Sequence, residues 1–290
     1  HSTSRRQRQM CIRDRNMLDN IMLGSYSQNA LSGAATVNQI FFIVNQLALS
    51  IGNALVAICS QYWGKQETGA IRKMTGVALA LSVLIGAIVV TACTCIPEQL
   101  LRIFTTSPEI IAEGKAYLGL LKWTFLLFMI SNLLIAMLRS VETVKISFVI
   151  SVVSLITNGC INYTLIFGHF GFPEMGIQGA AVGTLTARML ELLIIVVYIW
   201  KIDTKVRLFD INLFRPIFLP ENRKIWGAFF KVAFPIMCSG MIWAISVPMQ
   251  TAILGHLSAD AIAANSVSST FFQYLKVIVI AISSACLLYT

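Results

Sequence analysis

Long apolar runs separated by short polar breaks constrain this chain more than any other feature. Seven runs are long enough to cross a bilayer, whose hydrocarbon core of about 30 Å takes about 20 helical residues. They cover 34–61, 74–96, 116–138, 146–168, 178–200, 227–253 and 261–285, and the end of one more helix precedes them at 16–24. Backbone groups in lipid must pair internally, and the alternating polarity of a membrane barrel is absent. The predicted fold class is therefore an all-α integral membrane protein.

The composition excludes several other classes of protein. The chain is 57% hydrophobic and 12% charged, whereas a soluble domain carries roughly 25% charged residues. The three His lie far apart, at 1, 169 and 256, and most of the Cys lie inside apolar runs, so neither a metalloenzyme nor a zinc site is predicted. No G-x-x-x-x-G-K-[ST] run is present to hold ATP. We therefore expect neither an enzyme nor a resident cofactor.

Basic residues gather in alternate breaks between the apolar runs. One set of breaks carries twelve of them, namely Lys65, Arg72, Lys73, Arg139, Lys145, Lys201, Lys205, Arg207, Arg215, Arg223, Lys224 and Lys231. The other breaks carry Arg102, Lys115 and Lys122. The positive-inside rule places the twelve in the cytoplasm, which makes "GSYSQNALSG" (24–33) an external turn. The basic balance then reflects topology and anionic lipid headgroups, and no nucleic-acid partner is predicted.

The chain divides into five segments. Residues 1–15, "HSTSRRQRQMCIRDR", resemble translated sequencing adapter and are interpreted as non-native, with a genuine basic arm as the alternative. Residues 286–290 are interpreted in the same way. Residues 16–200 form one lobe with a partial first span and five full spans, and 227–285 begin a second lobe with two spans. The charged, proline-containing break 201–226 is predicted to be a cytoplasmic connector.

A faint internal repeat supports this two-lobed plan. Residues 21–42 and 252–273 share a Leu-Gly helix end, a short polar turn and a new helix rich in Ala and Ser. Six spans separate the two copies, so they have the same orientation in the membrane. Parallel repeats of this kind are a known transporter plan. The second repeat is incomplete, and two full repeats of six helices would give about twelve spans.

Five stretches in order resemble the multidrug and toxic compound extrusion (MATE) family across residues 16–285. They are "LDNIMLG", "QYWGKQETGAIRKM", "NGCINYTLIFG", "GIQGAAVGTLTARMLEL" and "FPIMCSGMIW". The resemblance implies a monomeric, multi-pass antiporter of the bacterial cytoplasmic membrane, with two six-helix lobes facing a central cavity. It would couple Na⁺ or H⁺ entry to export of small, cationic or amphipathic compounds. The alternative is a flippase of related architecture for lipid-linked saccharides.

Asp19 is the first candidate site residue, because an ionised carboxylate among Met, Leu and Ile is costly in hydrocarbon. We interpret it as a proton site or a Na⁺ site, and no other metal is predicted. The alternative is an Asp at a helix end that external water solvates, since Gly24 follows only about 7.5 Å further along the helix. Gly240 stands where many members of the resembled family have a Glu, which shifts the coupling role to Asp19.

Three polar residues are candidates to join Asp19. Asn158 and Asn162 lie at i and i+4 on one helix face, and amide oxygens suit a hard cation. The alternative is hydrogen bonding between helices, and the resembled family often has an acid where Asn162 stands. Thr184 matches a Thr of the family, and it either adds a hydroxyl oxygen or bonds to its own helix.

The remaining candidates line a predicted cavity or tune the site. Arg188 and Glu191, at i and i+3, favour a structural ion pair, with tuning of the Asp19 pocket as the alternative. Lys276 lies mid-span, and the repeat maps it onto Asn45; it either faces the cavity or snorkels or pairs within its lobe. Trp243 lies away from the span ends and favours core packing over stacking on aromatic cations.

Overall fold

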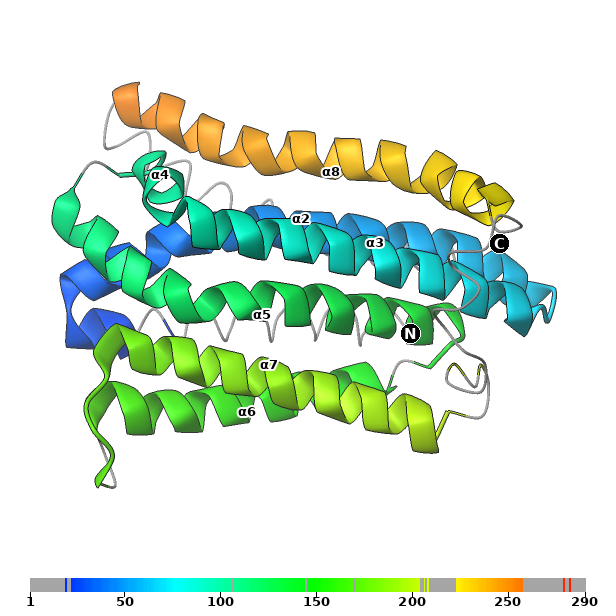
Figure 1. Ribbon diagram of the computed structural model, residues 1–290, viewed down its shortest axis with the longest axis horizontal. Helices are drawn as coiled ribbons and strands as arrows, with labels where there is room; N and C mark the ends of the chain where they lie inside the picture. The colour runs from blue at the N-terminus through cyan, green and yellow to red at the C-terminus, as the bar shows by residue number, and fades with distance from the viewer. Residues whose placement is uncertain are drawn as a thin grey trace.

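The described part of the chain is a bundle of long helices. The computed structural model describes residues 19, 22–105, 107–143, 145–168, 171–203, 206, 208, 223–257, 279 and 282. The helices in chain order are α2 (Gln28–Gly64), α3 (Thr68–Cys95), α4 (Pro97–Arg102), α5 (Pro108–Ser140), α6 (Lys145–Phe167), α7 (Gly176–Lys201) and α8 (Arg223–Leu257). The long helices run side by side along the molecule (Figure 1). Six of them are long and apolar enough to cross a membrane, so the all-α membrane class is confirmed.

Six of the seven full-length apolar runs coincide with these helices, and the seventh, 261–285, lies almost entirely outside the described residues. Five of these six helices are longer than the runs that predicted them, and α6, with 23 residues, equals its run in length. α2 has 37 residues and spans roughly 55 Å, and α5 begins at Pro108 rather than 116. An apolar run marks only the part of a helix that lipid surrounds, whereas the backbone stays helical through its polar ends.

The turn predicted at 24–33 is present but much shorter than expected. Residues 22–26 are helical, Ser27 is extended with φ −159° and ψ 137°, and α2 begins at Gln28. The break is a single residue, because polar side chains in this stretch are solvated without interrupting the helix. Ser25, for example, bonds to the carbonyl of Met22. The sequence analysis also missed α4, a short helix with Pro at its start and a Glu98–Arg102 ion pair.

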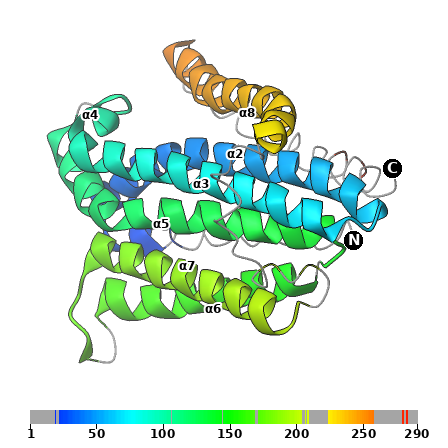
Figure 2. The same cartoon turned by 45° about the vertical axis from the view of Figure 1, so that its right-hand side comes forward.

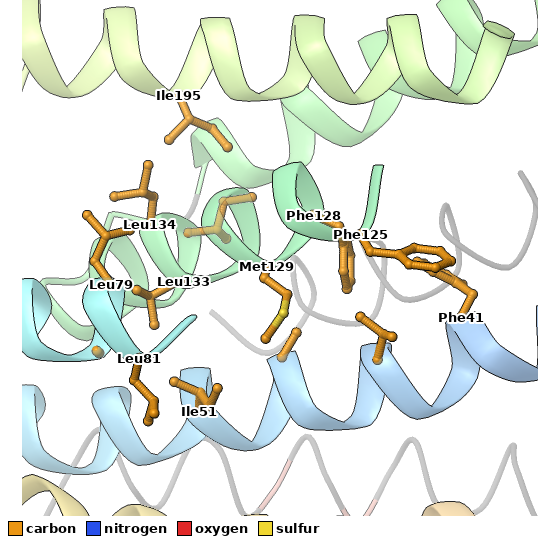
Figure 3. Packing of buried hydrophobic residues seen from close by; sticks show 14 of the residues in the cluster. Phe41, Ile51, Leu79, Leu81, Phe125, Phe128, Met129, Leu133, Leu134 and Ile195 are labelled. Carbon is orange, nitrogen blue, oxygen red and sulfur yellow. The ribbon is translucent and has the colours of Figure 1, made fainter. Parts of the chain in front are cut away.

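α5 is the central helix and packs against α2, α3 and α7 (Figure 1). Aromatic rings fill one of these contacts: Phe41 of α2 lies 5.3 Å from Phe128 and 6.0 Å from Phe125 of α5, centroid to centroid (Figure 3). Asn132 of α5 donates a hydrogen bond of 2.9 Å to the Ala48 carbonyl of α2. Lipid is as apolar as the helices, so close packing and such interhelical bonds hold the bundle together.

The two flanks of this core differ. α6 and α7 form a hairpin on one side of α5, whereas α8 packs against α2 and α3 on the far side, as both views show (Figures 1 and 2). The α6–α7 connection ends at Gly176, whose φ of +53° favours glycine, beneath the Tyr26 ring. Burial, and next a hydrogen bond with Glu174, raise the pKa of Tyr26 above its ordinary value. The hairpin therefore places α6 and α7 in direct contact, away from α8.

The basic loops lie together at one end of the bundle. Lys65 follows α2, Arg139 and Lys145 flank the α5–α6 turn, and Lys201 ends α7. Arg72, near the start of α3, donates a hydrogen bond to the carbonyl of Val206 at the same end. We call this the basic end of the bundle, and the positive-inside rule predicts that it faces the cytoplasm.

Candidate functional site

The carboxylate of Asp19 is buried rather than solvated. The side chain is 6% exposed, and Asn162 of α6 donates a hydrogen bond of 2.5 Å from Nδ2 to Asp19 Oδ1. Asn162 lies five residues before the end of α6, about 7.5 Å inside that end of the helix. The alternative of an external, water-solvated Asp is therefore wrong, because a neighbouring helix covers the group and supplies a donor.

A second hydrogen bond lies one turn deeper. Asn158 donates from Nδ2 to Thr184 Oγ1 of α7 at 3.3 Å, which links the two helices of the hairpin. Both Asn158 and Asn162 are fully buried, and Thr184 is nearly so. The Oδ1 atoms of the two Asn have no hydrogen-bond partner among the described residues. The structure thus brings together the four residues Asp19, Asn158, Asn162 and Thr184.

Glycine makes this close approach of α6 and α7 achievable. A Cβ atom at Gly183 would overlap Oδ1 of Asn162, and one at Gly179 would lie 2.8 Å from the Leu165 carbonyl. The two glycines are four residues apart and face α6 along one side of α7. Small residues at this spacing let membrane helices approach closely. Gly183 therefore sets the position of Asn162 and, through it, the position of the Asp19 hydrogen bond.

The predicted ion pair between Arg188 and Glu191 is confirmed. Arg188 NH1 lies 2.6 Å from Glu191 Oε2, and both side chains are buried. Ser131 of α5 donates a 3.4 Å hydrogen bond to Glu191 Oε1, and the guanidinium carbon lies 4.6 Å from the centroid of the Phe128 ring. The pair neutralises its own charge one turn beyond Thr184, at the contact between α5 and α7.

This arrangement offers oxygen atoms to a positive ligand. Asp19 supplies a carboxylate, and the two Asn contribute amide oxygens that have no hydrogen-bond partner among the described residues. Carboxylate, amide and hydroxyl oxygens are the ligands that hard cations prefer, and a carboxylate can also take up a proton. The chemistry of the group therefore suits a proton or a small cation rather than an anion.

The other candidates lie apart from this group. Asn45 is half-buried on α2, and Lys276 lies outside the described residues. Trp243 of α8 is 39% exposed and its ring centroid lies 5.7 Å from that of Phe42 on α2. Trp243 is therefore only partly buried rather than packed in the core of the described helices, and its helix α8 lies at the flank of the bundle (Figure 2).

The sequence analysis missed three residues that shape the site. Ser131 and Phe128 come from α5, more than fifty residues before the ion pair that they contact, so no local spacing reveals them. Gly183 did carry a signal, since "GAAVG" (179–183) has the small-x-x-x-small spacing of closely packed membrane helices. That pattern predicts a helix contact but does not name the partner.

The six apolar helices long enough to cross a membrane, packed around a buried carboxylate, define a polytopic helical membrane protein. The family model described as MatE matches residues 9–164, more than half of the chain. The chain therefore belongs to the MatE family and is a multi-pass membrane protein. Members of this family are transporters rather than enzymes.

Curated relatives are similar along most of the chain. A probable multidrug resistance protein NorM from Thermotoga maritima is 27% identical over 252 residues, which is 87% of this chain and 53% of the relative. One of the same description from Rhizobium meliloti is 27% identical over 248 residues, 86% of this chain and 49% of the relative. The chain thus spans about half the length of the curated relatives that it matches.

Solved structures share the fold. A crystal structure of MATE in complex with MaD3S superposes with a TM-score of 0.84 at 18% identity, covering 98% of this chain and 62% of that one. A MOP superfamily transporter from Pyrococcus furiosus gives 0.83 at 17% identity, covering 98% and 61%. At these identities the likeness establishes the arrangement of helices and leaves the function to be argued from the site.

Proposed function

We propose that the chain forms part of a cation-coupled antiporter that exports small, cationic or amphipathic compounds across the bacterial cytoplasmic membrane. In this proposal residues 16–200 are its first lobe, 201–226 a cytoplasmic connector and 227–285 the start of the second lobe. The complete transporter has about twelve spans and works as a monomer. The description of the relatives as multidrug resistance proteins supports multidrug export.

The buried hydrogen bond between Asp19 and Asn162 carries this proposal. The Asp19 carboxylate is 6% exposed, and burying such a group among membrane helices costs free energy. Ionisable groups in this setting usually mark functional sites. The unpaired amide oxygens beside it add acceptors and no charge. Loading the site with H⁺ or Na⁺ would remove the buried negative charge, and the energy of the lobe would then depend on whether the coupling ion is bound.

Coupling follows if the ion and the exported compound prefer different states. The loaded form of Asp19 favours one packing of the lobe, and the exported compound favours another. The two ligands need not touch, because each shifts the same equilibrium between states. The downhill entry of the cation then drives the uphill exit of the compound.

The Asp19→Asn variant of the complete transporter tests the proposal. It keeps the size of the side chain and its polar contacts but loses the charge and the titration. Efflux of a fluorescent cationic dye from proteoliposomes, with Na⁺ and pH gradients imposed separately, is expected to fall to the background of empty vesicles. The exposed Glu67 provides a matched control, since Glu67→Gln removes a carboxylate in a loop. Efflux by Asp19→Asn at the rate of the unchanged protein would rule the proposal out.

The buried charges weigh against the alternative function of flipping lipid-linked saccharides. Such a cargo carries pyrophosphate, which several unpaired basic residues in the cavity would bind. The one buried basic side chain among the described residues is Arg188, and Glu191 already neutralises it. Binding of a lipid pyrophosphate, with no effect of cationic dyes, would favour the flippase instead.

A further inference from the structure

A line of polar side chains runs along one face of α6, from the Asp19 contact towards the basic end. Its members are Ser147, Ser151, Ser154, Asn158 and Asn162, and all five are buried. Steps of three or four residues keep them on one face of the helix. We call these five residues the α6 polar file. It runs from residue 147 to residue 162, a rise of about 22 Å along the helix.

Four of the five residues of the α6 polar file carry a buried polar atom without a hydrogen-bond partner among the described residues. Ser147 Oγ, Ser154 Oγ, Asn158 Oδ1 and Asn162 Oδ1 have no hydrogen-bond partner in the part of the chain that the structure describes. Ser151 bonds only to the carbonyl of Ser147 in its own helix, at 2.9 Å. A buried polar atom without a partner costs about 1–3 kcal/mol, and native proteins rarely leave several together.

The position of these atoms indicates that water forms their missing hydrogen bonds. Buried polar groups that lack protein partners are usually bridged by ordered water, which makes two to four hydrogen bonds. Unpaired hydroxyl and amide groups once per turn of one helix would support a continuous chain of such waters. The file ends at Asn162, which bonds to Asp19, and at Ser147, two residues after the first residue of α6 at the basic end.

We propose that the α6 polar file is a hydrated proton route that connects Asp19 to the cytoplasmic end of the lobe, an inference that rests on the proposed function. The protonated carboxyl of Asp19 gives its proton to a water beside Asn162 and becomes a carboxylate. Each water or serine hydroxyl along the file accepts one proton and passes on another. The last water at Ser147 delivers the proton to the cytoplasm, and every group in the file ends unchanged.

The geometry favours protons over metal ions on this route. A hard cation needs about six oxygen ligands at one place, and the file offers one side chain per turn. Arg188 does not block a proton on this route, because Glu191 neutralises its charge and the guanidinium lies against the Phe128 ring of α5.

Cysteine labelling tests whether the file is wet. Ser147→Cys and Ser154→Cys would be made in a complete transporter whose native cysteines are replaced and which still exports dye. A small methanethiosulfonate reagent reacts with thiolates, which form only where water reaches. The controls are Ile195→Cys on α7, a position in the hydrophobic core that is 0% exposed, and Ile156→Cys on the opposite face of α6, which is 60% exposed. We expect both file positions to react at least tenfold faster than both controls.

The direction of the route is tested with the same variants. A membrane-impermeant reagent added from the cytoplasmic side should label Ser154→Cys, and adding Ser147→Leu should slow that labelling about tenfold by closing the mouth. Labelling of Ser154→Cys at the rate of Ile195→Cys, or labelling only from the external side, would overturn the route. The labelling rates do not depend on transport activity. Slow labelling would therefore contradict the proton route even if Asp19→Asn abolishes efflux, and normal efflux by Asp19→Asn would contradict the proposed function even if the file is wet.

A transport measurement tests the choice of the proton. Ser154→Val and Ser154→Thr introduce side chains of nearly the same shape, but Val lacks the hydroxyl that Thr keeps, so efflux driven by a pH gradient should slow about tenfold more in Ser154→Val than in Ser154→Thr. Efflux that responds only to a Na⁺ gradient, or pH-driven efflux unchanged in Ser154→Val, would contradict the proton route while leaving cation-coupled export intact.

Discussion

The substitution Gly183→Ala tests how the site is positioned, because it changes no polar group. Gly183 lies on α7 at the point where α6 comes closest, and a Cβ there would overlap Oδ1 of Asn162. The backbone of α6 is further away, since its nearest atom, the Asn162 nitrogen, would lie 3.5 Å from the new methyl group. The Asn162 side chain must therefore move, and the helices need not.

The size of the effect follows from two contributions. Inserting a methyl group into a filled site costs about 1–3 kcal/mol, and losing the hydrogen bond to the Asp19 carboxylate costs about 1.5–3 kcal/mol more. The higher helix propensity of Ala returns about 1 kcal/mol. We expect a net loss of about 1.5–5 kcal/mol in stability, together with a large loss of efflux.

Gly119→Ala is the matched control for the measurement. Gly119 is exposed on α5, and a Cβ there meets no atom within 4 Å. This variant should be neutral or more stable by about 0.5–1 kcal/mol. Thermal unfolding of the purified transporter in a mild detergent, and dye efflux in proteoliposomes, would compare the two alanine variants under the same conditions.

A double-mutant cycle isolates the clash. In the Asn162→Ala background the methyl group at Gly183 has room, so Gly183→Ala should cost little beyond the loss already caused by Asn162→Ala. If Gly183→Ala destabilises equally in both backgrounds, the methyl group acts through the backbone and the positioning argument is refuted. The same conclusion follows if Gly183→Ala leaves both stability and efflux unchanged.

Two further substitutions have defined outcomes. Glu191→Gln leaves Arg188 buried beside a neutral partner and should lower the free energy of unfolding by about 3–5 kcal/mol, measured by thermal unfolding. The double variant with Arg188→Met should recover most of that loss. No recovery would show that the ion pair is not the source of the loss. In Gly176→Ala the new Cβ would sit on a left-handed residue with φ +53° and lie 2.7 Å from the Tyr26 ring. This variant should lower the free energy of unfolding by at least about 1–2 kcal/mol. Adding Tyr26→Ala should remove the clash with the ring but not the backbone strain.

The sequence predicted the membrane helices well, because lipid imposes a simple rule on them. A helix that crosses the hydrocarbon core must be apolar over about 20 residues, so runs such as 116–138 predicted α5. The helix ends were less accurate: α5 extends from Pro108 to Ser140. Polar residues outside the hydrocarbon core can be helical or not, so a polar stretch does not show where a helix ends. The turn predicted at 24–33 is therefore a break at one residue, Ser27.

The site was predictable only where its partners are close in sequence. The i, i+3 spacing of Arg188 and Glu191 correctly predicted their ion pair. The bond between Asn162 and Asp19 joins residues 143 positions apart, and the resemblance to a family, rather than any spacing, suggested grouping them. The Ser131 contact was out of reach, because it depends on how α5 is rotated against α7, which many side chains decide together.

The buried charges connect the site to its proposed work. Among the described residues the buried charged side chains are Asp19, Arg188 and Glu191, and the last two form an ion pair that contributes no net charge. The interior of the lobe is therefore neutral when Asp19 is loaded and carries one negative charge when it is empty. In a low dielectric that difference is worth several kcal/mol, so the empty state needs water near Asp19, whereas the loaded state tolerates a dry interior. In the proposed cycle, release of the coupling ion from Asp19 therefore requires water beside the carboxylate. The hydroxyl and amide groups of α6 that lack protein partners lie where such water could bind.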